Sequence, residues 1–249
     1  MYRGSRKHVL DWTDRPAFLD ELRELLPEVP LEIEGEVHWM PQGHAKPDEG
    51  RLETFGPSWL PAHPAWRKME DWWLKYKGGA NTPNWDIAVG CTIENRPGLV
   101  LVEAKANWPE LSTAGKPLSS GASQNSRQNH AHIGAAIDEA CAGWRRTDPR
   151  ITISRDTHYQ LANRLAFTWK LASLGISVVL LYLGFTGDEG IRDAGKPFVD
   201  NADWRRAFGD YVEHSFPVDL VGGRFEFGET PAWVLSRSRA VLSQSPPAG

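Results

Sequence analysis

Three charged residues lie at the ends of two apolar segments, where charges are unexpected. Asp86 opens the segment 86–93 (DIAVGCTI), and Glu103 and Lys105 close the segment 98–105 (GLVLVEAK). Two neighbouring carboxylates can hold a divalent cation, and an ammonium beside them can stabilise charge that develops on a phosphate oxygen. Oxygen ligands alone suit Mg²⁺ or Mn²⁺ better than zinc. These residue types are therefore the ones that hydrolysis of a phosphodiester requires.

The two segments are predicted to form a β-hairpin, whose register decides whether the three charges meet. Glu103 and Lys105 share one face because side chains alternate along a strand. With a four-residue turn over 94–97, Asp86 stands opposite Lys105 and diagonal to Glu103, on that same face. A shift of one residue would move Asp86 to the other face. The hypothesis therefore requires a register in which all three side chains point the same way.

Around this hairpin the hydrophobic periodicity predicts an α/β fold. The continuous apolar run 176–185 (ISVVLLYLGF) is typical of an interior strand buried on both faces, with the preceding helix as its crossover. The other predicted elements are helices at 14–26, 64–77, 123–145, 156–174 and 203–214, a strand at 31–40, loops at 41–63 and 107–122, and a strand or hairpin at 224–236. We expect a single domain over residues 1–249, in which helices flank a central mixed β-sheet and the tail 243–249 is disordered.

At the charged residues the chain resembles the PD-(D/E)XK nuclease superfamily, which has the restriction-endonuclease-like fold. The superfamily has an Asp on one strand and (D/E)-x-K at the end of the partner strand; Asp86 and then Glu103-Ala104-Lys105 match this pattern, with Trp85 where Pro is usual. The resemblance covers about residues 64–185. It implies an αβββαβ core with N- and C-terminal additions, catalysis by Asp86, Glu103 and Lys105, and Mg²⁺ or Mn²⁺ bound by the two carboxylates. The substrate it implies is DNA, less often RNA, and many superfamily members that cut both strands are homodimers.

An acid on the helix before the hairpin is a common further metal ligand in this superfamily. Glu70, in the helix predicted at 64–77, is the match that we prefer. The segment between this helix and Asp86 is too short for a separate first strand, however. If the predicted strand 31–40 fills that place, the helix before it becomes the first helix of the core, and Glu21 or Glu24 replaces Glu70.

Charge is distributed unevenly along the chain, although the net charge is only −4. Residues 11–53 contain 12 acids against 4 Lys and Arg, whereas residues 115–170 contain 8 Lys and Arg against 4 acids. A phosphate-bearing partner would prefer the second region, and two ordinary solvated faces would give the same pattern. The residues predicted to contact nucleic acid there are Lys116, Gln124, Arg127 and Arg164.

Composition indicates a globular protein of the cytoplasm. Hydrophobic residues make up 41% and charged residues 24% of the chain, and the longest apolar run is about half the ~20 residues that a membrane span needs. The basic N-terminal residues are not followed by an apolar segment, so no targeting segment is expected. Cys91 and Cys141 have no metal-site spacing and are predicted to be reduced core residues.

Two other functions fit the same residues. A protein with the nuclease fold could bind nucleic acid or a partner without cutting it. Alternatively, the 12 tryptophans could act with the paired carboxylates in a sugar-binding or glycoside-cleaving site. The tryptophans near the hairpin in sequence are Trp66, Trp72, Trp73, Trp85 and Trp108.

Overall fold

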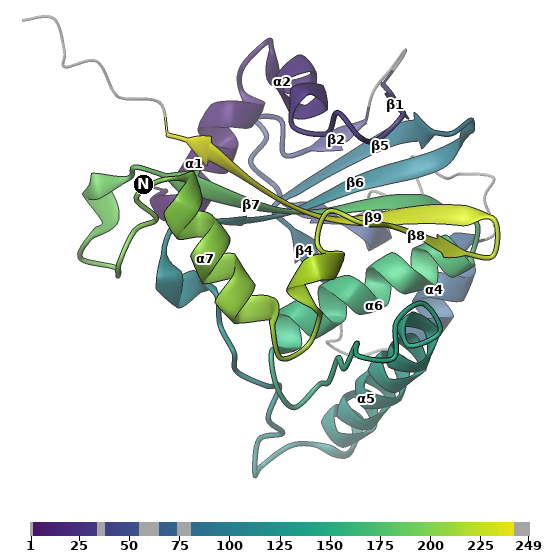
Figure 1. The fold of residues 1–249 in the computed structure, drawn as a ribbon. Coiled ribbons are helices and arrows are strands. Elements are labelled where there is room, and N and C mark those ends of the chain that lie inside the picture. Colours follow the sequence, from purple (N-terminus) through teal and green to yellow (C-terminus); the bar gives the residue numbers. More distant parts are fainter. Residues whose placement is uncertain (1, 34–37, 55–64, 74–80, 242–249) are drawn as a thin grey trace, which may run out of the picture.

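A computed structural model describes residues 2–33, 38–54, 65–73 and 81–241. Seven strands form one curled mixed β-sheet: β1 (Leu31–Glu32), β2 (Trp39–Met40), β5 (Ile87–Ile93), β6 (Arg96–Lys105), β7 (Ser177–Thr186), β8 (Arg224–Phe227) and β9 (Thr230–Ala240). Their spatial order is β1-β5-β6-β7-β9-β8, and β2 also pairs with β5 (Figure 1). The predicted α/β class with a central mixed sheet is confirmed. The tail 243–249 lies outside the described residues.

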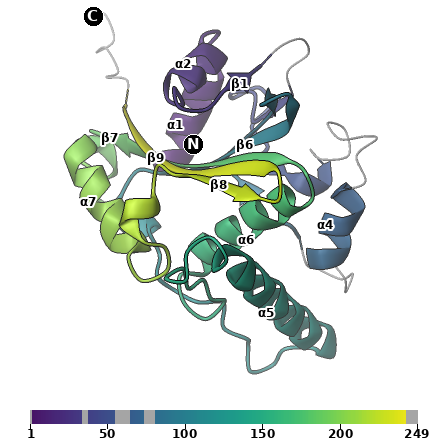
Figure 2. The ribbon, with the colours of Figure 1, turned by 45° about the vertical axis from the view of Figure 1, so that its right-hand side comes forward.

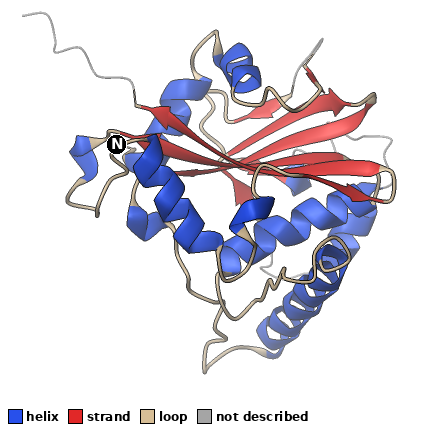
Figure 3. Cartoon of the chain, viewed as in Figure 1, coloured by secondary structure: helices blue, strands red, loops and turns tan. Residues whose placement is uncertain are grey.

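Helices cover both faces of this sheet (Figures 2 and 3). α1 (Gly4–Thr13) and α2 (Phe18–Glu24) lie on one face, and α4 (Ala65–Trp73), α5 (Gln124–Trp144), α6 (Tyr159–Ser173) and α7 (Asn201–Val212) lie on the other. Three short 3₁₀ helices are η1 (Trp108–Glu110), η2 (Glu189–Ile191) and η3 (Val218–Leu220). Strand alternation divides the core accordingly. Leu99 and Leu101 pack with the α6 side, whereas Val100 and Val102 pack with the α1 and α2 side.

The parallel strands of the sheet determine where α5, α6 and α7 lie. β6 pairs with β7 in parallel, and β7 pairs with β9 in parallel. Parallel neighbours require crossover connections, and here α5 and α6 link β6 to β7 while α7 links β7 to β9. All ten residues of β7 are buried, which confirms the interior strand predicted at 176–185. The ends of β6 and β7 therefore lie beneath the start of α6.

The predicted hairpin is present, but its turn is shorter than expected. β5 and β6 pair antiparallel with Ile93 opposite Arg96, so the turn contains only Glu94 and Asn95. Both turn residues have positive φ angles, 51° and 59°, which the twist of a two-residue hairpin favours. The predicted four-residue turn is therefore wrong. The register moves by two residues, however, and an even shift leaves every side chain on its predicted face.

Pro97 explains why a longer turn was expected. Proline cannot donate to a β-ladder and usually marks a strand end. In this hairpin Arg96 is the residue whose amide faces β5, so the nitrogen of Pro97 faces the opposite side. β7 begins opposite Gly98, one residue later, so no β7 carbonyl requires a donor at Pro97. β6 can therefore include Pro97 without losing a hydrogen bond.

The N-terminal part differs most from the sequence prediction. The helix predicted at 14–26 is α2, which is shorter, and a second helix, α1, precedes it. Asp14, the first residue of the predicted helix, is instead the C-cap of α1, and its amide donates to the Leu10 carbonyl over 3.1 Å. The sequence did not predict α1, because basic residues interrupt the apolar pattern of its buried side, which includes Val9 and Trp12.

Two predicted loops are also more structured than expected. Within 41–63, β3 (Gly50–Arg51) pairs with β4 (Asn84–Trp85). Within 107–122, Ala114 bridges to Thr157 just before α6. The strand predicted at 31–40 is observed as β1 and β2, and residues 34–37 between them lie outside the described part. Among the described helices, none is long and apolar enough to cross a membrane.

The left-handed turn makes the hairpin sensitive to substitution at Asn95, whose side chain is exposed. We expect Asn95→Val to lower the free energy of unfolding by about 1 kcal/mol or more, because a β-branched residue is strained at positive φ. Asn95→Gly removes that strain and is expected to leave stability unchanged or slightly raised. Urea denaturation of both variants checks this, and equal stabilities would contradict the two-residue turn.

Candidate active site

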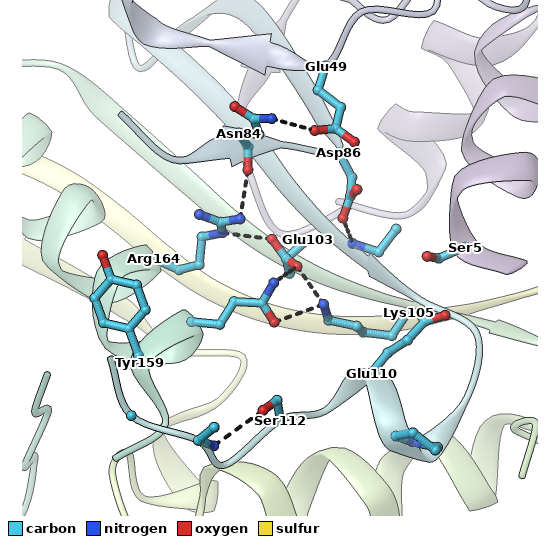
Figure 4. A pocket seen from close by; sticks show the side chains of 15 residues that line it. Ser5, Glu49, Asn84, Asp86, Glu103, Lys105, Glu110, Ser112, Tyr159 and Arg164 are labelled. Atoms are coloured by element: carbon cyan, nitrogen blue, oxygen red, sulfur yellow. Dashed lines mark hydrogen bonds and ion pairs between the residues drawn. The ribbon is translucent and has the colours of Figure 1, made fainter. Parts of the chain in front are cut away.

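The hairpin brings Asp86, Glu103 and Lys105 to the face of the sheet that α6 covers (Figure 4). Glu103 and Lys105 alternate with Ala104, which packs on the opposite side. Ile87 pairs with Val102, so Asp86, one residue earlier, reaches the chain beside Glu103. Its Oδ2 atom accepts a hydrogen bond from the Ala104 amide over 2.8 Å. The predicted convergence of the three residues is therefore observed, with Asp86 beside Glu103 instead of opposite Lys105.

Glu103 is a buried carboxylate with donors on both oxygens. Its Oε1 atom accepts from Lys105 Nζ over 2.6 Å and from Gln160 Nε2 over 2.7 Å, and its Oε2 atom accepts from Arg164 Nε over 2.7 Å. Gln160 also accepts from Lys105 Nζ through Oε1, over 2.9 Å. Gln160 and Arg164 are four residues apart on α6, so both project from the same side of that helix. We call Glu103, Lys105, Gln160 and Arg164 the Glu103 network.

Arg164 is a structural partner of the site and not an open phosphate contact. Its guanidinium donates to Glu103, to the Asn84 carbonyl over 2.7 Å and to Asn163 Oδ1 over 2.9 Å. It also stacks 4.5 Å from the centroid of the Trp85 ring, and only 7% of its side chain is exposed. This differs from the sequence prediction, in which Arg164 was one of four residues expected to contact nucleic acid.

The two carboxylates have opposite electrostatic environments. Burial is the largest cause that raises the pKa of Asp86 to about 7, and the nearby Glu103 charge is the second, while Lys105, the Ala104 amide and Arg164 offset them only in part. Burial also disfavours the Glu103 anion, but Arg164 and Lys105 outweigh this effect and hold the pKa of Glu103 below its ordinary value. Glu103 therefore has two direct ion pairs, whereas Asp86 forms none with the residues that the structure describes.

These residues line a cavity of about 610 Å³ at the end of the hairpin. Two further acids contribute to its wall, and the sequence did not predict either. Glu49 accepts from Asn84 Nδ2 over 2.8 Å, and Glu110 accepts from the Ala106 amide over 2.9 Å. Ser5, at the start of α1, reaches the cavity from the other side (Figure 4). The cavity thus joins the hairpin, α6, η1 and the N-terminal helix.

The acids predicted as a third metal ligand lie elsewhere. Glu70 is half-buried on α4, and no described residue of α4 lines the cavity. Glu21 pairs with Arg15 and Arg239 on the opposite face of the sheet, and Glu24 is exposed on α2. None of these three acids lines the cavity. In the part of the chain that the structure describes, no group of three or more His, Cys, Asp or Glu side chains is placed to hold a metal ion.

The other residues predicted to contact nucleic acid lie at the start of α5. Lys116 lines a second cavity of about 480 Å³, and its ammonium lies 4.7 Å from the centroid of the Tyr159 ring. Gln124 and Arg127 are exposed in the first turns of α5 and line neither cavity. Several cations of the basic region 115–170 are already paired with acids: Arg150, Arg155, Arg164 and Lys170. Lys116 is the predicted contact that remains close to the site.

Gln160 is the functional residue that sequence reasoning missed most clearly. An amide near the start of a helix has no distinctive pattern, and residues 156–174 were predicted only as a central packing helix. A partial signal exists in the spacing, because Gln160 and Arg164 are polar residues four apart on an otherwise apolar helix. Such a pair indicates a polar partner inside the fold, and that partner is Glu103.

No protein-family profile, curated protein or solved structure matches this chain.

The Glu103 network is expected to contribute strongly to stability. Arg164→Met removes one partner from a buried ion pair, and we expect a loss of about 3–5 kcal/mol in the free energy of unfolding. Glu103→Gln combined with Arg164→Met should cost less than the sum of the single changes, because both act on one interaction. Urea denaturation measures this cycle, with the exposed Arg67→Met as a control. Additive effects would show that the two residues are not coupled.

Asp86 should make stability depend on pH. Its folded-state pKa of about 7 lies above the ordinary value of 3.8, so protonation stabilises the folded protein at low pH. This contribution is complete below about pH 4 and is lost as the pH rises through 7. Asp86→Asn should therefore be more stable than the parent at pH 8, by on the order of 1–4 kcal/mol, and this advantage should shrink towards pH 5. Denaturation in EDTA at both pH values tests this; a gap that does not vary with pH would contradict it.

Proposed function

We propose that this protein is a divalent-metal-dependent phosphodiester hydrolase, a nuclease that acts on DNA. The observation that carries the proposal is the convergence of Asp86, Glu103 and Lys105 on one face at the end of the hairpin, inside a cavity. An acid, a second acid and an ammonium in one cavity are the groups that stabilise charge and activate water at a phosphate.

The order of elements supports a restriction-endonuclease-like core for this proposal. The N-terminal helices precede β1 and β2, which pair antiparallel with β5, and β5 pairs antiparallel with β6. α6 then leads to β7, which is parallel to β6. With β3, α4, β4 and α5 taken as additions, this succession follows the αβββαβ order that the resemblance implies. In this arrangement the acid-x-lysine segment occupies the end of the third core strand.

The residues present fit a magnesium or manganese ion. Asp86 and Glu103 would hold it, and their donor atoms are oxygens only, as these ions prefer. Magnesium is usually bound through one or two carboxylates, with waters and substrate phosphate completing its shell, so a protein cluster of three acids is not required. Asp86 fits this role best, because the nearby charges of Lys105 and Arg164 offset the effect of its burial only in part. When bound, the ion would polarise a phosphate oxygen and lower the pKa of a bound water.

In this proposal, Lys105 would act on the phosphate directly. An ammonium has three donors, and Lys105 uses two of them on Glu103 and Gln160. The third remains for a phosphate oxygen or the attacking water. Gln160 fixes the direction of the lysine because its amide accepts from Lys105 and donates to Glu103. The network thus orients the ammonium before substrate arrives, which reduces the reorganisation that the reaction requires.

A second candidate function is binding of nucleic acid without cleavage. The observation that favours it is that both oxygens of Glu103 already have donors from Lys105, Gln160 and Arg164. A metal ion would have to share or displace one of these bonds. By contrast, the sugar-binding alternative loses its basis, because Trp72, Trp73 and Trp85 are buried in the core and Trp108 packs beneath Lys196. Trp66 has no described side chain.

A cleavage assay decides between the two candidates. The protein is incubated with supercoiled plasmid, linear duplex, single-stranded DNA and RNA in Mg²⁺, Mn²⁺ or EDTA. We expect metal-dependent cleavage of DNA, and a loss of at least about a hundredfold in Asp86→Asn and in Lys105→Met, because each change removes a charge that acts on the reacting phosphate.

Asp138→Asn and Lys68→Met are the matched controls, since both residues are exposed and away from the cavity. Cleavage that persists in EDTA or survives both active-site changes would come from another site or a contaminant. Intact substrates in every metal, together with measurable DNA binding, would favour the non-cleaving function.

A further inference from the structure

We call the cavity that Asp86 and Glu103 line the carboxylate cavity. The second cavity, which Lys116 lines, adjoins it at Tyr159, and this residue lines both. The wall between them is held in place by hydrogen bonds. The amides of His158 and Tyr159 donate to the carbonyls of Thr113 and Ala114, each over 2.9 Å, and the Lys116 amide donates to the Arg155 carbonyl over 2.9 Å. The two cavities therefore have a fixed spatial relation, with residues 113–116 and the first turn of α6 between them.

One end of the second cavity is suited to an anion. The Lys116 ammonium lies over the Tyr159 ring and has no carboxylate partner among the residues that the structure describes. The α5 helix begins beside it, where Ser123 caps the Ser126 amide and the remaining first-turn amides have no acceptor within the helix. His130 fixes this arrangement, because its Nε2–H donates to the Lys116 carbonyl over 2.7 Å. Charge and helix polarity therefore favour a phosphate here.

The rest of the cavity is suited to a flat, partly apolar group. Leu118 is 41% exposed at its edge, and the buried Ile133 and the Tyr159 ring contribute apolar surface. Asn129 also lines the cavity; it is 9% exposed, and its buried Oδ1 atom has no hydrogen-bond partner. A buried amide without a partner is destabilising, so its presence points to a ligand that supplies a donor. A nucleobase has apolar faces and N–H groups along its edge.

We propose that this cavity binds one nucleotide of a single-stranded segment, next to the phosphate held in the carboxylate cavity. The phosphate of that nucleotide lies at Lys116 and the start of α5, and its base lies against Leu118, Ile133 and Tyr159 with its edge at Asn129. A base inside the cavity cannot be paired, so the substrate is single-stranded or unpaired at this position. The placement beside a reacting phosphate rests on the proposed function.

Binding of oligonucleotides to the full chain in EDTA tests this inference without cleavage. The probes are a fluorescein-labelled oligothymidylate and a blunt duplex of the same length, measured by fluorescence anisotropy. We expect the single strand to bind more tightly than the duplex. Lys116→Gln and Asn129→Leu should each weaken single-strand binding roughly tenfold and change duplex binding by less than about twofold. Arg145→Gln, which removes an exposed charge at the other end of α5, should have no effect.

Thermal unfolding separates binding from folding. Asn129→Leu replaces an unpartnered buried amide with an apolar group of similar size, so it should unfold at an equal or higher temperature while it binds more weakly. The inference is overturned if Lys116→Gln and Asn129→Leu bind the single strand like the parent, or if the parent binds blunt duplex as tightly. The same variants in the cleavage assay distinguish the two proposals: intact cleavage with unchanged binding refutes only the nucleotide cavity, and weakened binding without any cleavage supports the cavity and refutes only hydrolysis.

Discussion

The buried Glu103 carboxylate is the constraint on which the arrangement of this site depends. A charge removed from water is costly unless hydrogen bonds and opposite charges compensate it. Here the compensation comes from two elements that are 50 or more residues apart in sequence: Lys105 from the same strand, and Gln160 and Arg164 from α6. The end of β6 and the start of α6 must therefore stay in contact, and this contact fixes how the crossover helix lies over the sheet.

This compensation also determines how the second carboxylate behaves. Arg164 and Lys105 direct their donors to Glu103, so among the described residues Asp86 receives a hydrogen bond from the Ala104 amide alone. Two neighbouring acids thus differ: the pKa of Glu103 is lowered and that of Asp86 is raised to about 7. A cation would gain most at Asp86, because this is where the negative charge is least neutralised. The asymmetry arises from hydrogen-bond geometry, since both side chains occupy the same face of one hairpin.

The sequence predicted the strands of the site better than its helical side. The shared face of Asp86, Glu103 and Lys105 follows from strand alternation, which survived an error of two residues in the turn because the period of a strand is two. The buried strand β7 and its crossover were predicted from continuous hydrophobicity. By contrast, helix periodicity shows which side of α6 is apolar but not which polar residue meets a distant carboxylate. Gln160 was therefore missed, and Arg164 was predicted as a surface contact. Glu49 could not be found, because the pairing of β3 with β4 has no periodic signal in two residues each.

The first turn of α6 lies between the two cavities, and the backbone conformation just before it determines where its side chains lie. His158 precedes the helix with φ at 47°, a left-handed conformation that is unfavourable for a residue other than glycine. The hydrogen bonds to Thr113 and Ala114 hold this conformation in place. The helix can then begin abruptly at Tyr159, so that Tyr159 faces both cavities and Gln160, the next residue, reaches Glu103. The strained residue therefore links the second cavity to the orientation of Lys105, because the same turn of helix carries Tyr159, which lines that cavity, and Gln160, which contacts Lys105.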